Sequence, residues 1–136
     1  MHRLRAFLLL AAALLAATPA LAQKSPVTAT AAVERAPLRA GEVGQVRVDA
    51  RIAAPYHIYS VVQLPDPAPL PSSLELEGPV ESVGDVVEST PETKFDKGFE
   101  KETGIHGPEG TFTRAFRVPA DAKPGTLSVD ARFRFQ

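Results

Sequence analysis

Two short stretches carry most of the side chains that could do chemistry. PYHIYS spans residues 55–60, and KFDKGFEKETGIHG spans residues 94–107. The candidates are Tyr56, His57 and Tyr59 in the first stretch and Phe95, Asp96, Phe99 and Glu100 in the second. A tyrosine at a sheet edge usually packs with its hydroxyl in water. Phenylalanines in a charged segment are expected to fold back onto the protein, either as simple anchors or as a lid over a binding site.

The composition restricts the chemistry that is possible. The 136 residues contain no cysteine, so thiol catalysis by these residues is excluded, and no G-x-S-x-G stretch indicates a serine nucleophile. We expect His57 to be a half-buried strand residue and His106 a solvated loop residue, because their spacing matches no zinc or copper motif. A metal-handling role for these two histidines is the weakest alternative. We expect no metal and no cofactor.

The charged residues give no sign of a catalytic pair or of nucleic-acid binding. The acidic residues of the middle segment are spread out, which is typical of a solvated face: Glu81, Asp85, Glu88, Glu92, Asp96, Glu100 and Glu102. The formal net charge is −1, and no basic cluster provides the face that nucleic acid requires.

Alternating apolar and polar residues predict the strands that must position these stretches. Val46, Val48, Ala50 and Ile52 alternate with polar residues, and residues 27–33 behave similarly. Residues 53–61 predict a third, short strand. The four prolines of residues 63–73 exclude a regular strand there, because proline cannot donate to a sheet ladder.

The second half of the chain predicts further strands around one long loop. Short strands are expected near residues 73–78 and 79–87, and Phe112 and Phe116 should share a buried face. Residues 88–110 have few apolar side chains, so we expect a long mobile loop there. The final strand should direct five side chains inward, namely Leu127, Val129, Ala131, Phe133 and Phe135. Six or seven strands with proline and glycine turns predict an all-β fold, an immunoglobulin-like β-sandwich.

The first 22 residues have the pattern of a secretory signal peptide. Arg3 and Arg5 precede an apolar run that is too short to span a membrane, and Ala20-Leu21-Ala22 follows as a cleavage site. We therefore expect export to the periplasm and a mature domain of residues 23–136.

Three stretches in this order resemble the N-terminal periplasmic domain of the thiol:disulfide interchange protein DsbD family. They are APYHIYSVVQLPDPAPLPSSLELEG (54–78), KFDKGFEKETGIHGPEGTFTRAFRVP (94–119) and GTLSVDARFRFQ (125–136). The resemblance covers nearly all of the chain from residue 27 onward. Its most specific part is HIYS followed by the proline-rich turn and SLELEG.

The resemblance implies a role in a reducing relay. In full-length members this immunoglobulin-like domain is followed by a transmembrane electron-carrying domain, and it passes electrons to oxidised periplasmic partners. These partners include disulfide isomerases and thioredoxin-like proteins of cytochrome c maturation. A mobile cap loop with an aromatic residue shields the redox cysteine pair. No nucleic acid and no small-molecule ligand are expected.

The family's site can be carried over to matching residues of this chain. Phe99 would be the cap aromatic, with Phe95 as the rival candidate, and Tyr59 together with Tyr56 would flank the site beside His57. Asp96 and Glu100 would be the acidic neighbours able to influence the pKa of a thiol.

The chain departs from the family at its redox centre. In the family, the strand matching LSVDARFRFQ leads directly into the first redox cysteine, and the sequence stops within a residue or two of that point. We therefore expect the chain to be redox-inactive as given, and to be a fragment of a relay protein. The alternative is a natural short protein that serves as a non-catalytic periplasmic protein-binding module.

Overall fold

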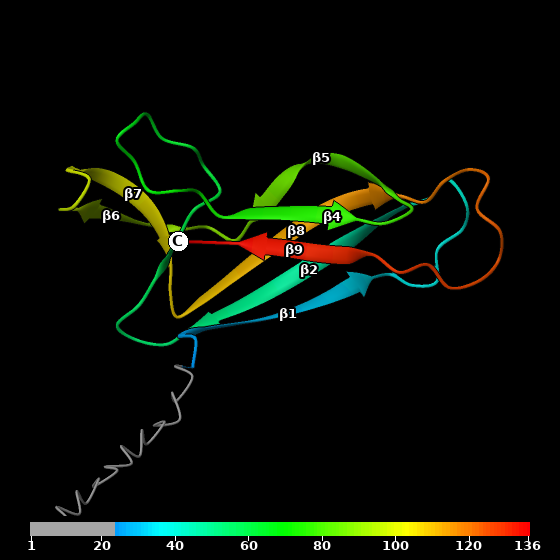
Figure 1. Cartoon of the computed structure of the whole chain (residues 1–136), viewed down its shortest axis with the longest axis horizontal. Coiled ribbons are helices and arrows are strands. Elements are labelled where there is room, and N and C mark those ends of the chain that lie inside the picture. Colours follow the sequence, from blue (N-terminus) through cyan, green and yellow to red (C-terminus); the bar gives the residue numbers. More distant parts are fainter. Residues whose placement is uncertain (1–23) are drawn as a thin grey trace, which may run out of the picture.

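The computed structural model describes residues 24–136, which form nine β-strands and no helix (Figure 1). Within this range, accordingly, no helix has the length and apolar character needed to cross a membrane. The predicted signal peptide, residues 1–22, lies outside the described residues. In chain order the strands are β1 (Val27–Glu34), β2 (Val43–Ile52), β3 (Ile58–Tyr59), β4 (Ser73–Glu77), β5 (Glu81–Glu88), β6 (Glu92–Asp96), β7 (Lys101–His106), β8 (Glu109–Arg117) and β9 (Asp130–Arg134).

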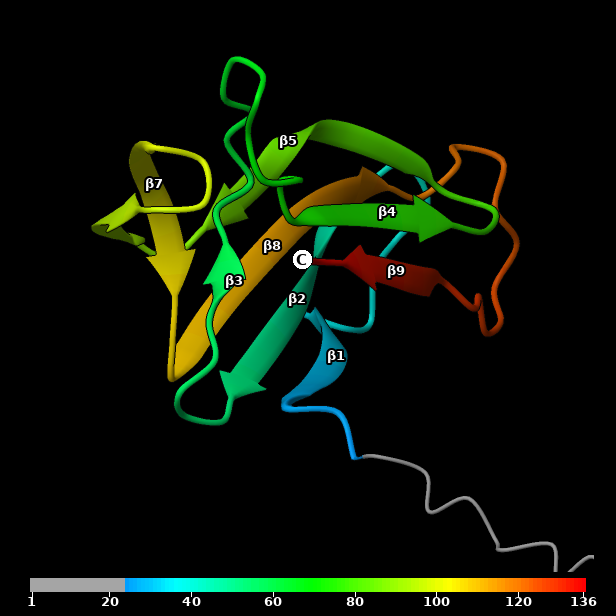
Figure 2. The same cartoon turned by 60° about the vertical axis from the view of Figure 1, so that its left-hand side comes forward.

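The strands form three antiparallel sheets. The largest has the order β1-β2-β8-β5, the second has the order β3-β7-β6, and β4 pairs with β9 in the third. Figures 1 and 2 show β4 and β9 lying across β2 and β8, while β3, β6 and β7 gather at one end. The fold is thus all-β, as predicted, and its layers are consistent with a β-sandwich.

The core lies between β2 and β8 on one side and β4 and β9 on the other. The predicted alternation of β2 is confirmed, since Val46, Val48, Ala50 and Ile52 are each at most 3% exposed. Phe112 of β8 is opposite Val48 and fully buried, and its ring lies 4.8 Å from that of Phe133 in β9. Burial of this apolar surface is the main stabilising contribution to such a fold.

A second, smaller core lies at the other end of β2. Phe116 and Val118 are buried there, and Leu38 packs against them from the β1–β2 connection. Gly44 of β2 makes this possible, because a Cβ at this position would overlap Leu38 Cδ1 and lie 2.9 Å from Phe116 Cζ.

The structure corrects two predictions about the elements. Residues 88–110 are not one long loop, because they contain β6, β7 and the start of β8, which brings the strand count to nine. The final strand is also shorter than expected. It spans Asp130–Arg134 only, and Leu127 and Phe135, which were predicted to point inward, are each 42% exposed.

Candidate functional site

Three of the predicted site residues meet at one end of the molecule. We call this the hairpin end, formed by β3, β6, β7 and the turn of residues 97–100 (Figure 2). Tyr59 of β3 donates a hydrogen bond of 2.6 Å from its hydroxyl to Asp96 Oδ2, at the end of β6. The ring of Phe99, in the turn, lies 6.4 Å from the Tyr59 ring in an edge-to-face arrangement, a geometry that aromatic pairs favour.

Asp96 shapes the turn that carries Phe99. Its second oxygen, Oδ1, accepts hydrogen bonds from the backbone N–H groups of Gly98 (2.8 Å) and Phe99 (3.2 Å). Side chains of this type often bond to the backbone two residues onward and so fix turns. Glu100 completes the turn with a φ of 54°, in the left-handed region. One carboxylate therefore holds both Tyr59 and the turn.

The turn is also tied to the proline-rich segment. Lys101 Nζ donates a hydrogen bond to the backbone oxygen of Pro65. Beside this segment lies a small, mostly apolar cavity of about 200 Å³, lined among others by Tyr59, Val62 and Pro69.

Burial and hydrogen bonding shift the pKa values of both groups of the Tyr59–Asp96 pair. Burial, helped by the hydrogen bond and the negative charge of Asp96, raises the pKa of Tyr59 to about 12. The hydrogen bond from Tyr59 lowers the pKa of Asp96, and the N–H groups of Phe99 and Gly98 add to this effect. At neutral pH the pair is thus a neutral phenol that donates to an ionised carboxylate.

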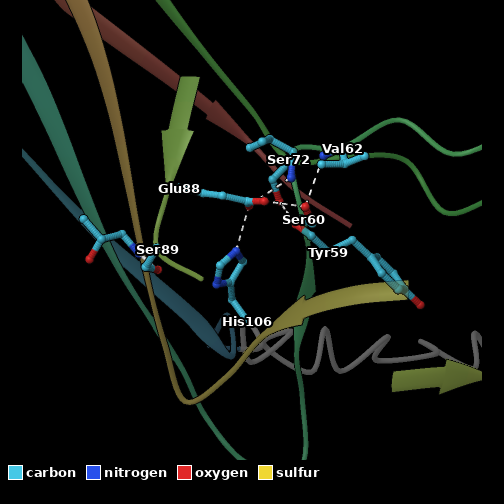
Figure 3. Close-up of polar contacts among 9 residues, drawn as sticks. Tyr59, Ser60, Val62, Ser72, Glu88, Ser89 and His106 are labelled. Carbon is cyan, nitrogen blue, oxygen red and sulfur yellow. Dashed lines mark hydrogen bonds and ion pairs between the residues drawn. The ribbon is translucent and has the colours of Figure 1, made fainter. Parts of the chain in front are cut away.

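Next to this pair lies a buried polar network around Glu88, at the end of β5 (Figure 3). Ser60 Oγ donates to Glu88 Oε1, and Val61 N donates to Oε2 at 3.0 Å. His106 Nε2 lies 2.8 Å from Oε2 as well. Ser72 Oγ donates to the backbone oxygen of Tyr59, while the Tyr59 ring points away from Glu88 (Figure 3).

This network contradicts two predictions. His106 was expected in solvent, but it is 3% exposed on β7, where its ring packs 5.0 Å from Phe112. Glu88 was assigned to a solvated face, but its side chain is only 10% exposed. One feature of the sequence could have indicated that His106 is buried. It follows Ile105, which is the only large apolar residue between Phe99 and Phe112. No local sequence pattern indicates that Glu88 is buried.

The remaining predicted residues are less involved. His57 is partly buried and stacks edge-to-face on Tyr59 at 5.2 Å, just before β3. Tyr56, which precedes β3, is 60% exposed, and Phe95, which lies in β6, is 57% exposed. Phe99, and not Phe95, is therefore the aromatic residue that contacts the Tyr59 ring. Among residues 24–136, no group of three or more His, Asp or Glu side chains is arranged to hold a metal ion.

Among residues 24–136, the hydrogen bonds of the Glu88 network do not arrange a serine hydroxyl against an imidazole base. Ser60 is the only hydroxyl next to the His106–Glu88 pair in Figure 3 that bonds to Glu88, and it donates to the carboxylate and not to the imidazole. A serine activated for attack would donate to the imidazole base. Comparison with family models, curated proteins and solved structures yields no match.

Proposed function

We propose that this chain is a partner-docking domain of a periplasmic thiol:disulfide relay, of the type found at the N-terminus of DsbD-family proteins. In this proposal the fold is an immunoglobulin-like sandwich and the turn 97–100 is the cap. The observation that carries the proposal is the contact of Tyr59 with both Asp96 and Phe99. In the family resembled, the cap aromatic shields the redox pair and tyrosines lie close by, and the contact between Phe99 and Tyr59 supports this assignment.

The direction of β9 supports the same assignment. This strand corresponds to the family strand that leads to the cysteine pair, and it runs toward the hairpin end in both views (Figures 1 and 2). Gln136, which follows it, accepts a hydrogen bond of 2.7 Å on its side-chain oxygen from Leu70 N. The strand is thus held against the proline-rich segment that borders the Tyr59 cavity.

Exposed apolar side chains suit the hairpin end to protein docking. Tyr56, Val62, Leu70 and Phe95 are each at least 57% exposed, and all belong to β6 or to segments that flank β3. Contiguous exposed apolar surface is typical of interaction sites, so the proposal takes these four side chains as the docking surface. The 136 residues contain no cysteine, so the proposal assigns them docking and shielding, and not the thiolate attack by which disulfides exchange.

The test measures binding to oxidised periplasmic thioredoxin-fold proteins by calorimetry. We expect a disulfide isomerase or a thioredoxin-like protein of cytochrome c maturation to bind, and Phe99→Ala to weaken that binding by roughly tenfold or more. Val62→Ala should weaken it as well. The matched control is Val43→Ala, since Val43 is exposed at the far end of β2. Failure of all these partners to bind, or equal loss with Val43→Ala, would contradict the proposal.

A second candidate function is a non-catalytic periplasmic protein-binding module. The absence of cysteine favours it. The two candidates differ in their response to the partner's redox state. A relay domain should distinguish oxidised from reduced partner, whereas a simple binding module should bind both forms with equal affinity.

A further inference from the structure

An apolar groove lies at the end of the molecule opposite to the hairpin end. Residues of two connections line it, 35–42 and 118–129, and Figure 1 shows both connections at this end. Its volume is about 620 Å³. Pockets for small organic ligands have volumes of roughly 300–1,000 Å³ and mostly apolar walls, so the size is suitable for such a molecule.

The groove opens directly onto the smaller of the two cores. Phe116 and Val118 form its floor and are buried, but Leu38, Val80 and Val129 around them are only partly covered. Leu127 and Val33, on its walls, are more than 40% exposed. The core at this end is therefore incompletely closed, and an apolar ligand would remove this surface from water.

The charges on the groove have one sign. Arg39 and Lys123 both line it, and no carboxylate side chain does. Within residues 24–136 neither cation takes part in an ion pair. The neighbouring Glu42 binds the backbone N–H of Arg39 and not its guanidinium. Both side-chain charges are thus free to meet an anion.

We infer that this groove binds a free amphiphilic carboxylate, with an alkyl chain against Phe116, Val118 and Leu127 and its headgroup near Arg39 and Lys123. This inference is independent of the proposed docking function, because the groove and the hairpin end share no residue. Ligand binding would also close the small core, so it should stabilise the folded state through mass action.

The test titrates the 136-residue chain with decanoate below its critical micelle concentration. We expect saturable 1:1 binding, a melting temperature that rises with decanoate concentration, and NMR shift changes in residues 38–40 and 122–129. Decyltrimethylammonium, which has the same chain and the opposite charge, should bind at least tenfold more weakly. Removal of both cations by Arg39→Gln with Lys123→Gln should abolish that preference.

A variant of the wall tests the apolar part of the inference. Leu127→Glu places a carboxylate in the groove at an already exposed position, and it should weaken decanoate binding at least tenfold. Leu70→Glu, at the hairpin end, is the matched control and should bind normally. If Leu127→Glu does not fold, the double variant Arg39→Gln with Lys123→Gln still tests the inference, because both of its positions are on the surface. The inference is overturned by absence of saturable binding, by equal affinity for both detergents, by shift changes elsewhere, or by binding to anionic phospholipid vesicles alone.

Discussion

The phenol of Tyr59 and the carboxylate of Asp96 link the strand β3 to the turn that follows β6. The pKa of Tyr59 is raised from 10.0 to about 12 in the folded protein. Its contribution to stability is therefore complete below pH 10 and is lost as the pH rises toward 12. The pKa of Asp96 is lowered from 3.8, so its contribution is present above this value and is lost as the pH falls through its folded pKa.

A tyrosine titration tests this pair directly. The chain has only two tyrosines, so Tyr56→Phe leaves Tyr59 as the only phenol that absorbs. Ultraviolet absorbance should then show a transition near pH 12. Adding Asp96→Asn should move it toward 10 without reaching that value, because burial remains the largest cause of the shift. A transition near pH 10 in both proteins would show that Tyr59 is not held as described.

Glu88 should be far more important for stability than its other acidic neighbours. Glu88→Ala would leave Ser60 Oγ, Val61 N and His106 Nε2 without their partner, and leaving a buried polar group unsatisfied costs about 1–3 kcal/mol. Glu81→Ala, on the same strand but exposed, should cost less than about 0.5 kcal/mol. Urea unfolding measures both. Similar losses for the two variants would contradict a structural role for the network.

At the scale of single residues, the grouping of Tyr59, Asp96 and Phe99 could be proposed only from the family resemblance. The expectation that an aromatic residue in a charged segment folds back onto the protein applied equally to Phe95, which is 57% exposed. The burial of His106 and Glu88 could not be predicted, because it depends on β5 and β7 meeting β3, and this contact joins residues far apart in the chain.

At the scale of elements, alternation was a reliable signal only in the central strands. It predicted β2, in which one face is buried along the whole strand, and β8, in which Phe112 and Phe116 are buried. It failed in β1, where Val33 is 43% exposed, and at the two ends of the final segment, where Leu127 and Phe135 are each 42% exposed. The β6–β7 hairpin was not predicted, because its strands pair through the backbone while most side chains of β6 are exposed. Such an edge hairpin needs few apolar residues, and a charged sequence therefore looks like a loop.

Hydrogen exchange distinguishes the hairpin from the predicted loop. Amides in the paired positions of β6 and β7 should be protected, though less than those of β2 and β8, because the hairpin buries little apolar surface. Within residues 92–106, the amides of the turn should exchange faster than the paired amides, with Gly98 and Phe99 slowed by their hydrogen bonds to Asp96. Lack of protection throughout residues 92–106 would contradict the hairpin and support the predicted mobile loop. Protection equal to that of β2 would rule out a turn that can open.

At the scale of the whole molecule, the all-β fold separates two ends with different surfaces. The hairpin end combines Tyr59, Asp96 and Phe99 with exposed apolar side chains, and the other end contains the apolar groove between residues 35–42 and 118–129. The all-β class followed from strand alternation and turn residues. The division into three sheets did not, because the pairing of β4 with β9 joins segments more than fifty residues apart.

The central claim is that an oxidised thioredoxin-fold partner docks on the hairpin end, and NMR mapping tests it most directly. The isotope-labelled chain is titrated with an unlabelled, oxidised disulfide isomerase, and the shifts of its backbone amides are followed. We predict that the largest changes fall on Tyr59, Val62 and residues 97–100, and that Phe99→Ala reduces them. Changes centred on residues 38–40 and 122–129, or no change at saturating partner, would contradict the claim.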